Sequence, residues 1–314
     1  MVKVRKRSHT LVWSELCLFL KMLLKDYRET ITVSESICES KLLHVSIVSY
    51  GSSLPLLLSA INSILVSLGP LKCLHSSAAF SITLVDNSDL NELKQENFSP
   101  LKEDMTRVSC ELKLIQGQGN VGYGRGQNLA FNAQHAKYHL FMNPDVELDP
   151  ECLRAGISYL EKNKDVAIGS PYATDMQGNK QYLCKRYPTV LDLLIRGLAP
   201  ELNRYIYPER AKRYEIHDLS ETEPTKHIPI VSGCFMLCRS KVIREISGFD
   251  HKYFLYFEDF NLSLRAGEIA SIAYLPAMRI KHTGGNASKK GPAHIKYFLR
   301  SAFQFFSTHG WQWL

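Results

Sequence analysis

The sequence lacks the cysteine pairs that mark a zinc site or a disulfide framework. None of its eight cysteines forms a Cys-x-x-Cys pair, and no two pairs show zinc-site spacing. Most of them lie beside apolar residues, as Cys234 and Cys238 do on either side of Phe-Met-Leu. We therefore expect small, buried, reduced side chains and a cytoplasmic protein.

Long hydrophobic runs are also missing. The apolar stretch at 11–24 follows a basic cluster at 3–7, but Glu15 and Lys21 interrupt it and no small-residue cleavage site follows. It is too short and too charged to span a bilayer, and we expect no other segment to span one. An amphipathic helix that docks on the domain or lies on a membrane surface fits this stretch better.

Charge of one sign is only weakly in excess. The formal net charge is +7, and no Lys/Arg-rich run or RNA-binding aromatic signature accompanies it, so we expect no nucleic acid partner. The positive balance is compatible with nucleotide phosphates or anionic lipid. With 45% hydrophobic and 22% charged residues, the composition is that of an ordinary globular protein.

What is present is an alternation of strand-like runs, the first of them rich in β-branched residues, and helical patterns. Strands are expected at residues 43–50, 81–86, 111–116 and 138–142. Helices are expected at 54–68, 128–136 and 150–160. The alternation predicts an α/β fold with a mostly parallel sheet and helices on both faces, in which ligands bind at the carboxyl ends of strands. We divide the chain into an N-terminal helical extension (1–42), an α/β domain (43–286) and a basic-aromatic helical segment (287–314).

A glycine-rich loop at 117–128 follows the third expected strand. Its five glycines let the backbone approach a ligand, and the helix N-terminus that follows favours anions. Gly117, Gly119 and Gly122 match Gly-x-Gly-x-x-Gly, but a position after the third strand disfavours a dinucleotide fold, and the Lys-Ser/Thr of a P-loop is absent. The alternative is a flexible surface loop in which Arg125 and Asn128 are incidental.

Two strand ends carry candidate metal ligands. Asp145 follows Asn143-Pro144 where a divalent cation could bridge a diphosphate; the alternative is a turn former or helix cap. His282, at the end of a later expected strand, could bind a metal through one ring nitrogen, although a single histidine is more often structural.

A pair of adjacent carboxylates, Glu258 and Asp259, follows an aromatic run. Apolar walls raise the proton affinity of a carboxylate and suit it to act as a general base. The alternative is simply the start of a helix, with Asp259 near its N-cap.

In this order the motifs resemble family 2 glycosyltransferases, particularly their bacterial rhamnosyltransferase-like branch. The resemblance covers residues 45–285 and rests on the first strand, Val-Asp-Asn-Ser at 85–88, the glycine-rich loop, Phe-Met-Asn-Pro-Asp at 141–145, and Gly-Phe-Asp at 248–250 through Glu-Asp at 258–259. His282 with its following glycines completes the set. The resemblance implies the GT-A fold, a Rossmann-like mixed sheet.

The resemblance also implies roles for single residues. Asp86 would contact the nucleotide base or ribose, and Asp259, with its neighbour Glu258, would supply the catalytic base. Asp145 would be the last carboxylate of a metal-binding Asp-x-Asp whose first position is Asn143 here, and His282 would help bind the metal or diphosphate. The nucleotide-sugar site would also include Tyr50, Asn120, Gly122, Arg125, Asn128 and Asn143.

The implied activity is inverting, Mg²⁺- or Mn²⁺-dependent transfer of a sugar from a nucleotide donor. By resemblance we favour dTDP-L-rhamnose as donor, and a surface polysaccharide such as O-antigen, or its lipid-linked precursor, as acceptor. The alternatives are a sugar nucleotidyltransferase, whose signature is missing after the first strand, and a non-catalytic nucleotide-sugar or carbohydrate-binding module. The segment at 287–314 fits an interfacial helix, and so a peripheral membrane contact at the inner face of the cytoplasmic membrane; it fits a helix packed on the domain equally well.

Overall fold

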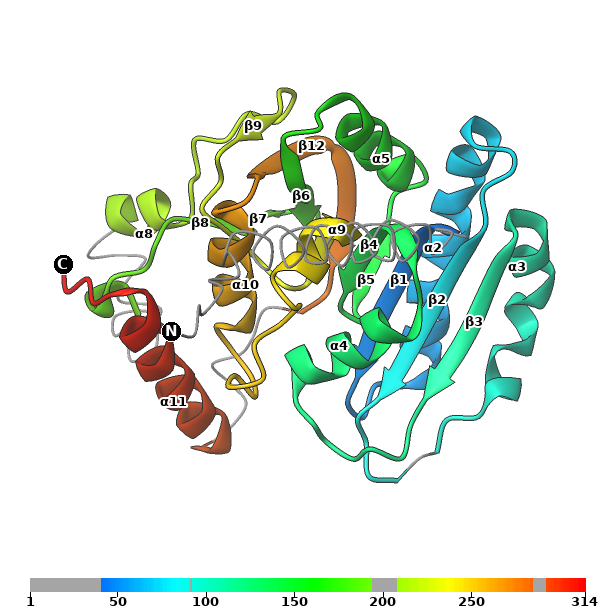
Figure 1. The fold of residues 1–314 in the computed structure, drawn as a ribbon, viewed down its shortest axis with the longest axis horizontal. Helices are drawn as coiled ribbons and strands as arrows, with labels where there is room; N and C mark the ends of the chain where they lie inside the picture. The colour runs from blue at the N-terminus through cyan, green and yellow to red at the C-terminus, as the bar shows by residue number, and fades with distance from the viewer. Residues whose placement is uncertain (1–40, 91, 194–207, 285–291) are drawn as a thin grey trace, which may run out of the picture. The chain divides into compact units, whose positions relative to one another are not determined.

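Four parallel strands build the first half of the sheet, in the order β3-β2-β1-β4. They are β1 (Lys41–Ser49), β2 (Phe80–Asp86), β3 (Cys110–Ile115) and β4 (Ala136–Met142). Each follows an expected strand closely, and β3 forms one edge of the sheet (Figure 1). The computed structural model describes residues 41–90, 92–193, 208–284 and 292–314, and residues 41–314 form one compact unit. The predicted extension at 1–42 therefore lies outside the described residues, except for its last two.

The second half of the sheet is mixed. β11 (Phe235–Arg239) lies antiparallel between β4 and β6 (Val166–Thr174), and β12 (Ser271–His282) runs parallel to β6. β5 (Val146–Leu148) pairs antiparallel with the end of β12. Short strands β7 (Lys180–Gln181) and β9 (Thr225–Lys226) extend β6 and β12, while β8 (Cys184–Lys185) and β10 (Ile230–Val231) pair separately. The prediction of a mostly parallel mixed sheet is confirmed.

Helices cover both faces of this sheet. One face packs against α2 (Leu54–Leu74), α3 (Lys102–Val108) and α5 (Cys152–Lys162), with the 3₁₀ helix η1 (Gln95–Leu101) leading into α3. The other face packs against α4 (Tyr123–Ala133), α9 (Ser240–Glu245) and α10 (Glu258–Gly267). Two further helices are α8 (Pro208–Tyr214) and α11 (Pro292–His309). Strand side chains alternate between two buried faces, and β1 is buried at every position from Leu43 to Ser49.

The largest differences from the expected helix boundaries are at the end of α2 and the start of α4. α2 was expected to close at Gly69-Pro70, but it continues to Leu74 because Leu71 is fully buried in the core beyond the proline. α4 begins at Tyr123, inside the glycine-rich loop and five residues before the expected start at Asn128. Local propensity favours a loop there, and tertiary packing overrides it.

The expectation that no segment could span a membrane is wrong for α2 on length and composition. Among the described helices, α2 alone is long and apolar enough to cross a bilayer. It packs in the core, however, where Leu57, Ile61, Ile64 and Leu68 are fully buried. The described cysteines are all free, and all but Cys73 are buried, as expected for small core side chains.

Candidate active site

The candidate residues lie near the carboxyl ends of the parallel strands, whose arrangement is shown in Figure 1. β1 to β4 are parallel, so their carboxyl ends point the same way. The start of antiparallel β11 and the end of β12 lie at this same end of the strands. β1 lies between β2 and β4, so the chain order reverses at this strand. Such a reversal opens a crevice at the carboxyl ends, where ligands bind in doubly wound sheets.

At the end of β2, two buried acceptor atoms lack a partner among the described residues. Asp86 is 2% exposed; its Oδ1 accepts the Ser88 N–H at 2.9 Å, whereas Oδ2 has no hydrogen bond. Gln118 donates to the Asp86 carbonyl at 2.7 Å, and its Oε1 is also unpartnered. Buried acceptors are normally satisfied, so both atoms are available to accept N–H or O–H donors from a ligand or from water. Tyr50 lies exposed just beyond β1.

The glycine-rich loop approaches another backbone closely at Gly122. Its φ is +87°, and a Cβ there would lie 2.4 Å from the Phe254 carbonyl oxygen, so only glycine fits. The Gly122 N–H donates to Asn120 Oδ1 at 3.1 Å, and the next N–H, of Tyr123, donates to the Phe254 carbonyl at 3.1 Å. The start of α4 is therefore fixed against residues 253–257, the segment that precedes Glu258.

Two predicted nucleotide-binding residues have backbone partners. Asn128 Nδ2 donates to the Phe249 carbonyl at 2.7 Å, and its Oδ1 accepts the Phe249 N–H at 2.9 Å. Arg125 donates from Nε and Nη2 to the His251 carbonyl at 3.1 and 2.9 Å. In this structure both side chains tie α4 to the 248–251 segment, and their contact with a nucleotide stays a prediction.

Asp145 and His282 form a pair at the ends of β4 and β12. The pairing of β12 with β5 places His282 opposite Val146, so His282 Nε2 lies 3.6 Å from Asp145 Oδ1. Gln181 fixes the histidine: its Nε2 donates to the His282 carbonyl at 2.9 Å, which leaves Oε1 to accept Nδ1–H at 2.8 Å. Burial lowers the pKa of His282 more than the Asp145 carboxylate raises it. The neutral ring then presents the Nε2 lone pair toward Asp145.

This pair fits a divalent cation as a partial ligand set. Asp145 Oδ1 is buried without a hydrogen bond among the described residues. Gly284 leaves the space beside it open, since a Cβ there would lie 2.2 Å from Asp145 Oδ2 and 3.0 Å from His282 Nε2. The described ranges contain no group of three or more His, Cys, Asp or Glu that could hold a metal. Two protein ligands leave positions for phosphate oxygens and water, which is how Mg²⁺ is usually held.

Asp259 lies at the start of α10, in contact with the turn before β11. Its Oδ2 accepts the Gly233 N–H at 2.8 Å and its Oδ1 accepts the Phe260 N–H at 2.9 Å, and the side chain remains partly exposed. Glu258 is buried, its Oε2 has no partner among the described residues, and burial followed by repulsion from Asp259 raises its pKa to about 8. Burial raises the pKa of Asp259 too, but N–H donors favour its charged form. At neutral pH the proton of this pair therefore resides on Glu258.

The family model for Glycosyl transferase family 2 matches residues 45–247, which is more than half of the chain. The chain belongs to glycosyl transferase family 2. The match includes the Asp86, Asn120 and Asp145 positions and ends before Glu258. The assignment of this glycosyltransferase's base therefore depends on the geometry of Asp259.

Two named relatives agree with the family. The chain is 25% identical over 238 residues to rhamnosyltransferase WbbL of Escherichia coli K12, covering 72% of this chain and 81% of WbbL. It is 24% identical over 217 residues to the N-acetylglucosaminyl-diphospho-decaprenol L-rhamnosyltransferase of Mycobacterium tuberculosis, covering 64% and 69% of the two chains.

The fold matches GT-A glycosyltransferases. GalNAc-T7, crystallised with UDP, GalNAc and Mn²⁺, aligns with a TM-score of 0.55 at 14% identity over 85% of this chain. The match spans about half (51%) of the GalNAc-T7 chain. Staphylococcus aureus TarS 1–349 with UDP-GlcNAc aligns with a TM-score of 0.51 at 12% identity, over 84% of this chain and 66% of TarS. The predicted GT-A fold of this glycosyltransferase is confirmed.

A buried hydrogen-bond chain, which the sequence did not predict, reaches Asp259 from the centre of the sheet. His139 Nε2 and Ser46 Oγ lie 2.8 Å apart, and Ser46 donates to Gln127 Oε1 at 2.5 Å. Gln127 donates to the Tyr123 hydroxyl at 3.0 Å, and this hydroxyl donates to the Gly233 carbonyl at 2.6 Å. Gly233 is the residue whose N–H holds Asp259. These linked hydrogen bonds therefore fix the position of the candidate base of this glycosyltransferase.

The backbone before Glu258 is strained and is held by α11. Tyr256 and Phe257 both have positive φ, of +69° and +62°, which costs energy for residues with a side chain. Phe257 packs against Phe298 and Phe305 of α11, each with a ring-centroid distance of 5.3 Å. α11 is therefore packed on the glycosyltransferase domain, which is one of the two arrangements left open for the C-terminal segment.

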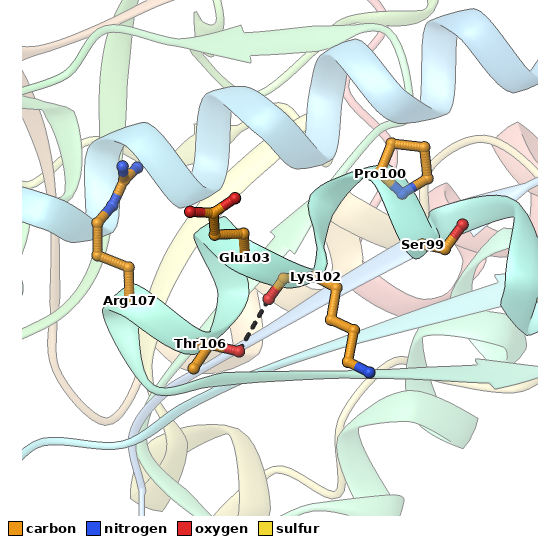
Figure 2. A pocket seen from close by; sticks show the side chains of 6 residues that line it. All are labelled: Ser99, Pro100, Lys102, Glu103, Thr106 and Arg107. Atoms are coloured by element: carbon orange, nitrogen blue, oxygen red, sulfur yellow. Dashed lines mark hydrogen bonds between the residues drawn. The ribbon is translucent and has the colours of Figure 1, made fainter.

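A second surface feature lies away from these residues. Figure 2 shows a hollow formed by the end of η1 and by α3, lined by Ser99, Pro100, Lys102, Glu103, Thr106 and Arg107. The charged ends of Lys102 and Arg107 point in different directions (Figure 2). Arg107 pairs with Asp104 at 2.7 Å, and the hollow contains no predicted site residue, so we assign it no role.

Proposed function

We propose that this glycosyltransferase transfers a sugar with inversion from a nucleotide donor to an acceptor hydroxyl, with Asp259 as the general base. The observation that carries the proposal is the environment of Asp259. Its carboxylate accepts two backbone N–H groups and stays partly exposed at the sheet edge that also holds Asp86 and Asp145. It therefore combines a fixed position with access to an acceptor.

The neighbouring Glu258 supports this assignment. A proton on Glu258 removes a second negative charge from beside the base, and Asp259 keeps a free lone pair to take the acceptor proton. The acceptor oxygen then attacks the anomeric carbon on the face opposite the leaving diphosphate, which inverts that carbon. The bond to the diphosphate breaks in the same step, so no covalent enzyme intermediate is needed.

Asp145 and His282 would hold Mg²⁺ or Mn²⁺ against the donor diphosphate. The bound cation would stabilise the negative charge that develops on the leaving nucleoside diphosphate. Gln181 keeps the Nε2 lone pair of His282 directed at this position. Asn143 replaces a carboxylate, which lowers the negative charge of the site and weakens its affinity for a cation.

For the donor we propose dTDP-L-rhamnose, and for the acceptor a lipid-linked glycan or a growing surface polysaccharide such as O-antigen. The support is similarity to two rhamnosyltransferases, one named for a diphospho-decaprenol acceptor. Asp86 Oδ2 and Gln118 Oε1 offer acceptors to the donor base or ribose. We place the reaction in the cytoplasm, at the inner face of the membrane.

Family membership disfavours a sugar nucleotidyltransferase, the main alternative from another enzyme class. A non-catalytic binding module of this family is the other alternative. A turnover assay separates it from an enzyme, because a module binds a nucleotide sugar without releasing the nucleoside diphosphate.

The test is a donor-hydrolysis screen. The purified chain is incubated with a panel of nucleotide sugars and Mg²⁺, Mn²⁺ or chelator, and free nucleoside diphosphate is measured. We expect slow release from dTDP-L-rhamnose that is lost on chelation and in Asp145→Ala. Release that survives chelation would reject the metal, and release from another donor would reject rhamnose.

The base is tested with Asp259→Asn, which keeps the side-chain shape and removes the proton acceptor. We expect transfer to fall by at least about 10²-fold, while the donor nucleotide binds nearly as before. The change removes the proton acceptor and one of its two backbone hydrogen bonds, but no proposed contact to the nucleotide. Asp165→Asn, at an exposed ion pair with Lys226, is the matched control and should transfer normally. Equal loss of binding and transfer in Asp259→Asn would contradict the base assignment.

A further inference from the structure

Helix α11 is anchored to the domain through one face. Phe305 and Phe306 are buried there, and Ser301 Oγ donates to the Leu255 carbonyl at 2.8 Å. Near the start of the helix, His294 Nδ1 lies 2.8 Å from the Tyr256 hydroxyl. The orientation of α11 on the 253–257 segment is therefore fixed, and so is the direction of its exposed side.

That exposed side carries large apolar side chains that the rest of the described domain leaves mostly uncovered. Ile295, Leu299 and Phe303 recur every four residues and are 62%, 58% and 65% exposed. Beyond the helix, Phe303 packs edge-on against Trp311 at 5.8 Å, and Trp311 stacks on Trp313 at 5.3 Å. We call these five residues the α11 outer face.

Exposed large apolar side chains are distributed unevenly over the molecule. Of the thirteen large hydrophobic side chains that are exposed in the described residues, six follow residue 292. Single exposed apolar residues are ordinary on a protein surface, whereas a contiguous group of them marks an interaction site.

The charge around this face identifies its partner. Lys296 and Arg300 directly follow Ile295 and Leu299 and are exposed. No Asp or Glu follows Glu268 anywhere in the chain, while Lys and Arg occur at 279, 281, 289, 290, 296 and 300. A second copy of the chain would place like charges against each other. The partner that complements the α11 outer face is instead a surface that combines apolar groups with negative charge.

We propose that the α11 outer face docks on an anionic bilayer. Its aliphatic and aromatic side chains lie at the level of the lipid headgroups, and Lys296 and Arg300 contact lipid phosphates. Since the inner face of α11 holds the segment before Asp259, docking keeps the base close to the membrane. A base held close to the membrane serves the reaction only if the acceptor is lipid-linked, as proposed above. The docking itself does not depend on that proposed function.

The test measures sedimentation of the full chain with vesicles, without any substrate. Vesicles of phosphatidylcholine alone are compared with equal parts of phosphatidylcholine and phosphatidylglycerol. We expect binding to the anionic vesicles and at least tenfold weaker binding for Leu299→Ser/Phe303→Ser. The matched control is Leu90→Ser/Met176→Ser, which changes two other apolar side chains that are more than half exposed and should bind as the parent does.

The electrostatic part is tested with Lys296→Gln/Arg300→Gln. We expect about 30-fold weaker binding to anionic vesicles, because each basic residue near such a surface contributes about 1 kcal/mol. Lys102→Gln/Lys241→Gln, two exposed lysines of other helices, should bind normally.

Three results would overturn the proposal: no binding to anionic vesicles, equal binding of parent and outer-face variants, or concentration-dependent self-association that Leu299→Ser/Phe303→Ser abolishes. Donor hydrolysis in solution needs no lipid. A chain that binds vesicles without hydrolysing any donor would refute the proposed function alone, and one that hydrolyses the donor without binding vesicles would refute the docking alone.

Discussion

Glu258→Gln should stabilise the fold, and by an amount that grows with pH. Burial and the nearby Asp259 raise the pKa of Glu258 to about 8, so the folded chain holds this proton more tightly than the unfolded chain does. The resulting stabilisation is complete below the unfolded pKa of about 4.3 and is lost as the pH rises toward about 8. Glutamine has the same shape, carries no titratable proton and escapes this loss.

The magnitude follows from the shift. At about 1.4 kcal/mol per pKa unit, the variant should exceed the parent in free energy of unfolding by about 1 kcal/mol at pH 5 and about 4 kcal/mol at pH 8. The difference between the two pH values, about 3 kcal/mol, is the quantity to test, because any constant effect of the amide cancels.

The assay is denaturant unfolding at pH 5 and pH 8, followed by circular dichroism. A midpoint shift at unchanged slope reports stability directly. Glu245→Gln makes the same chemical change at an exposed position of α9 and should show no such pH-dependent gain. If the gain of Glu258→Gln is the same at both pH values, Glu258 is not protonated in the fold, and the assignment of one proton to this pair fails.

Two further substitutions test the site. Gly284→Ala places a Cβ 2.2 Å from Asp145 Oδ2 and should weaken Mn²⁺ binding by about tenfold or more, measured by calorimetry; unchanged affinity would place the metal elsewhere. Tyr123→Phe removes the hydroxyl that donates to Gly233 and should lower kcat by about tenfold at an unchanged KM for the donor, since only the base is displaced. A kcat equal to that of the parent would show that the hydrogen-bond chain does not position Asp259.

The strands of the first half of the sheet could be predicted because their signal is local. β1 and β2 are short runs with β-branched residues, buried on both faces, and β4 is a mostly buried run of aromatic and aliphatic residues. β3, at the edge of the sheet, alternates exposed Glu111 and Lys113 with leucines. Once four such strands are parallel, their carboxyl ends must lie at the same end of the sheet. The proximity of Asp86, the glycine-rich loop and Asp145 then follows from topology, which is why this part of the site was visible in the sequence.

Contacts between distant segments left no such signal. Gln181 orients His282 across 101 residues, and nothing near position 181 indicates a partner. The start of α4 was misplaced for a similar reason. Gly124 and Gly126 suggest a loop, yet they lie within helix α4. A Cβ at these positions would lie only 3.0 Å from Phe249 and Val48, so glycine lets the helix pack this closely. Glycine here serves close packing between elements, which a single sequence does not distinguish from turn formation.

Composition alone could not decide how the C-terminal segment is arranged. Its aromatic content favoured a packed helix and an interfacial helix equally, because both need an apolar face. In α11 the positions 298, 301 and 305 lie on one side and 295, 299 and 303 on another, so the helix carries two apolar faces. The domain covers the first, which stabilises the strained turn at 256–257. The second remains exposed beside Lys296 and Arg300, so packing on the domain and docking on a membrane do not exclude each other. A helix that does both connects the surface that meets the lipid to the backbone that carries the base.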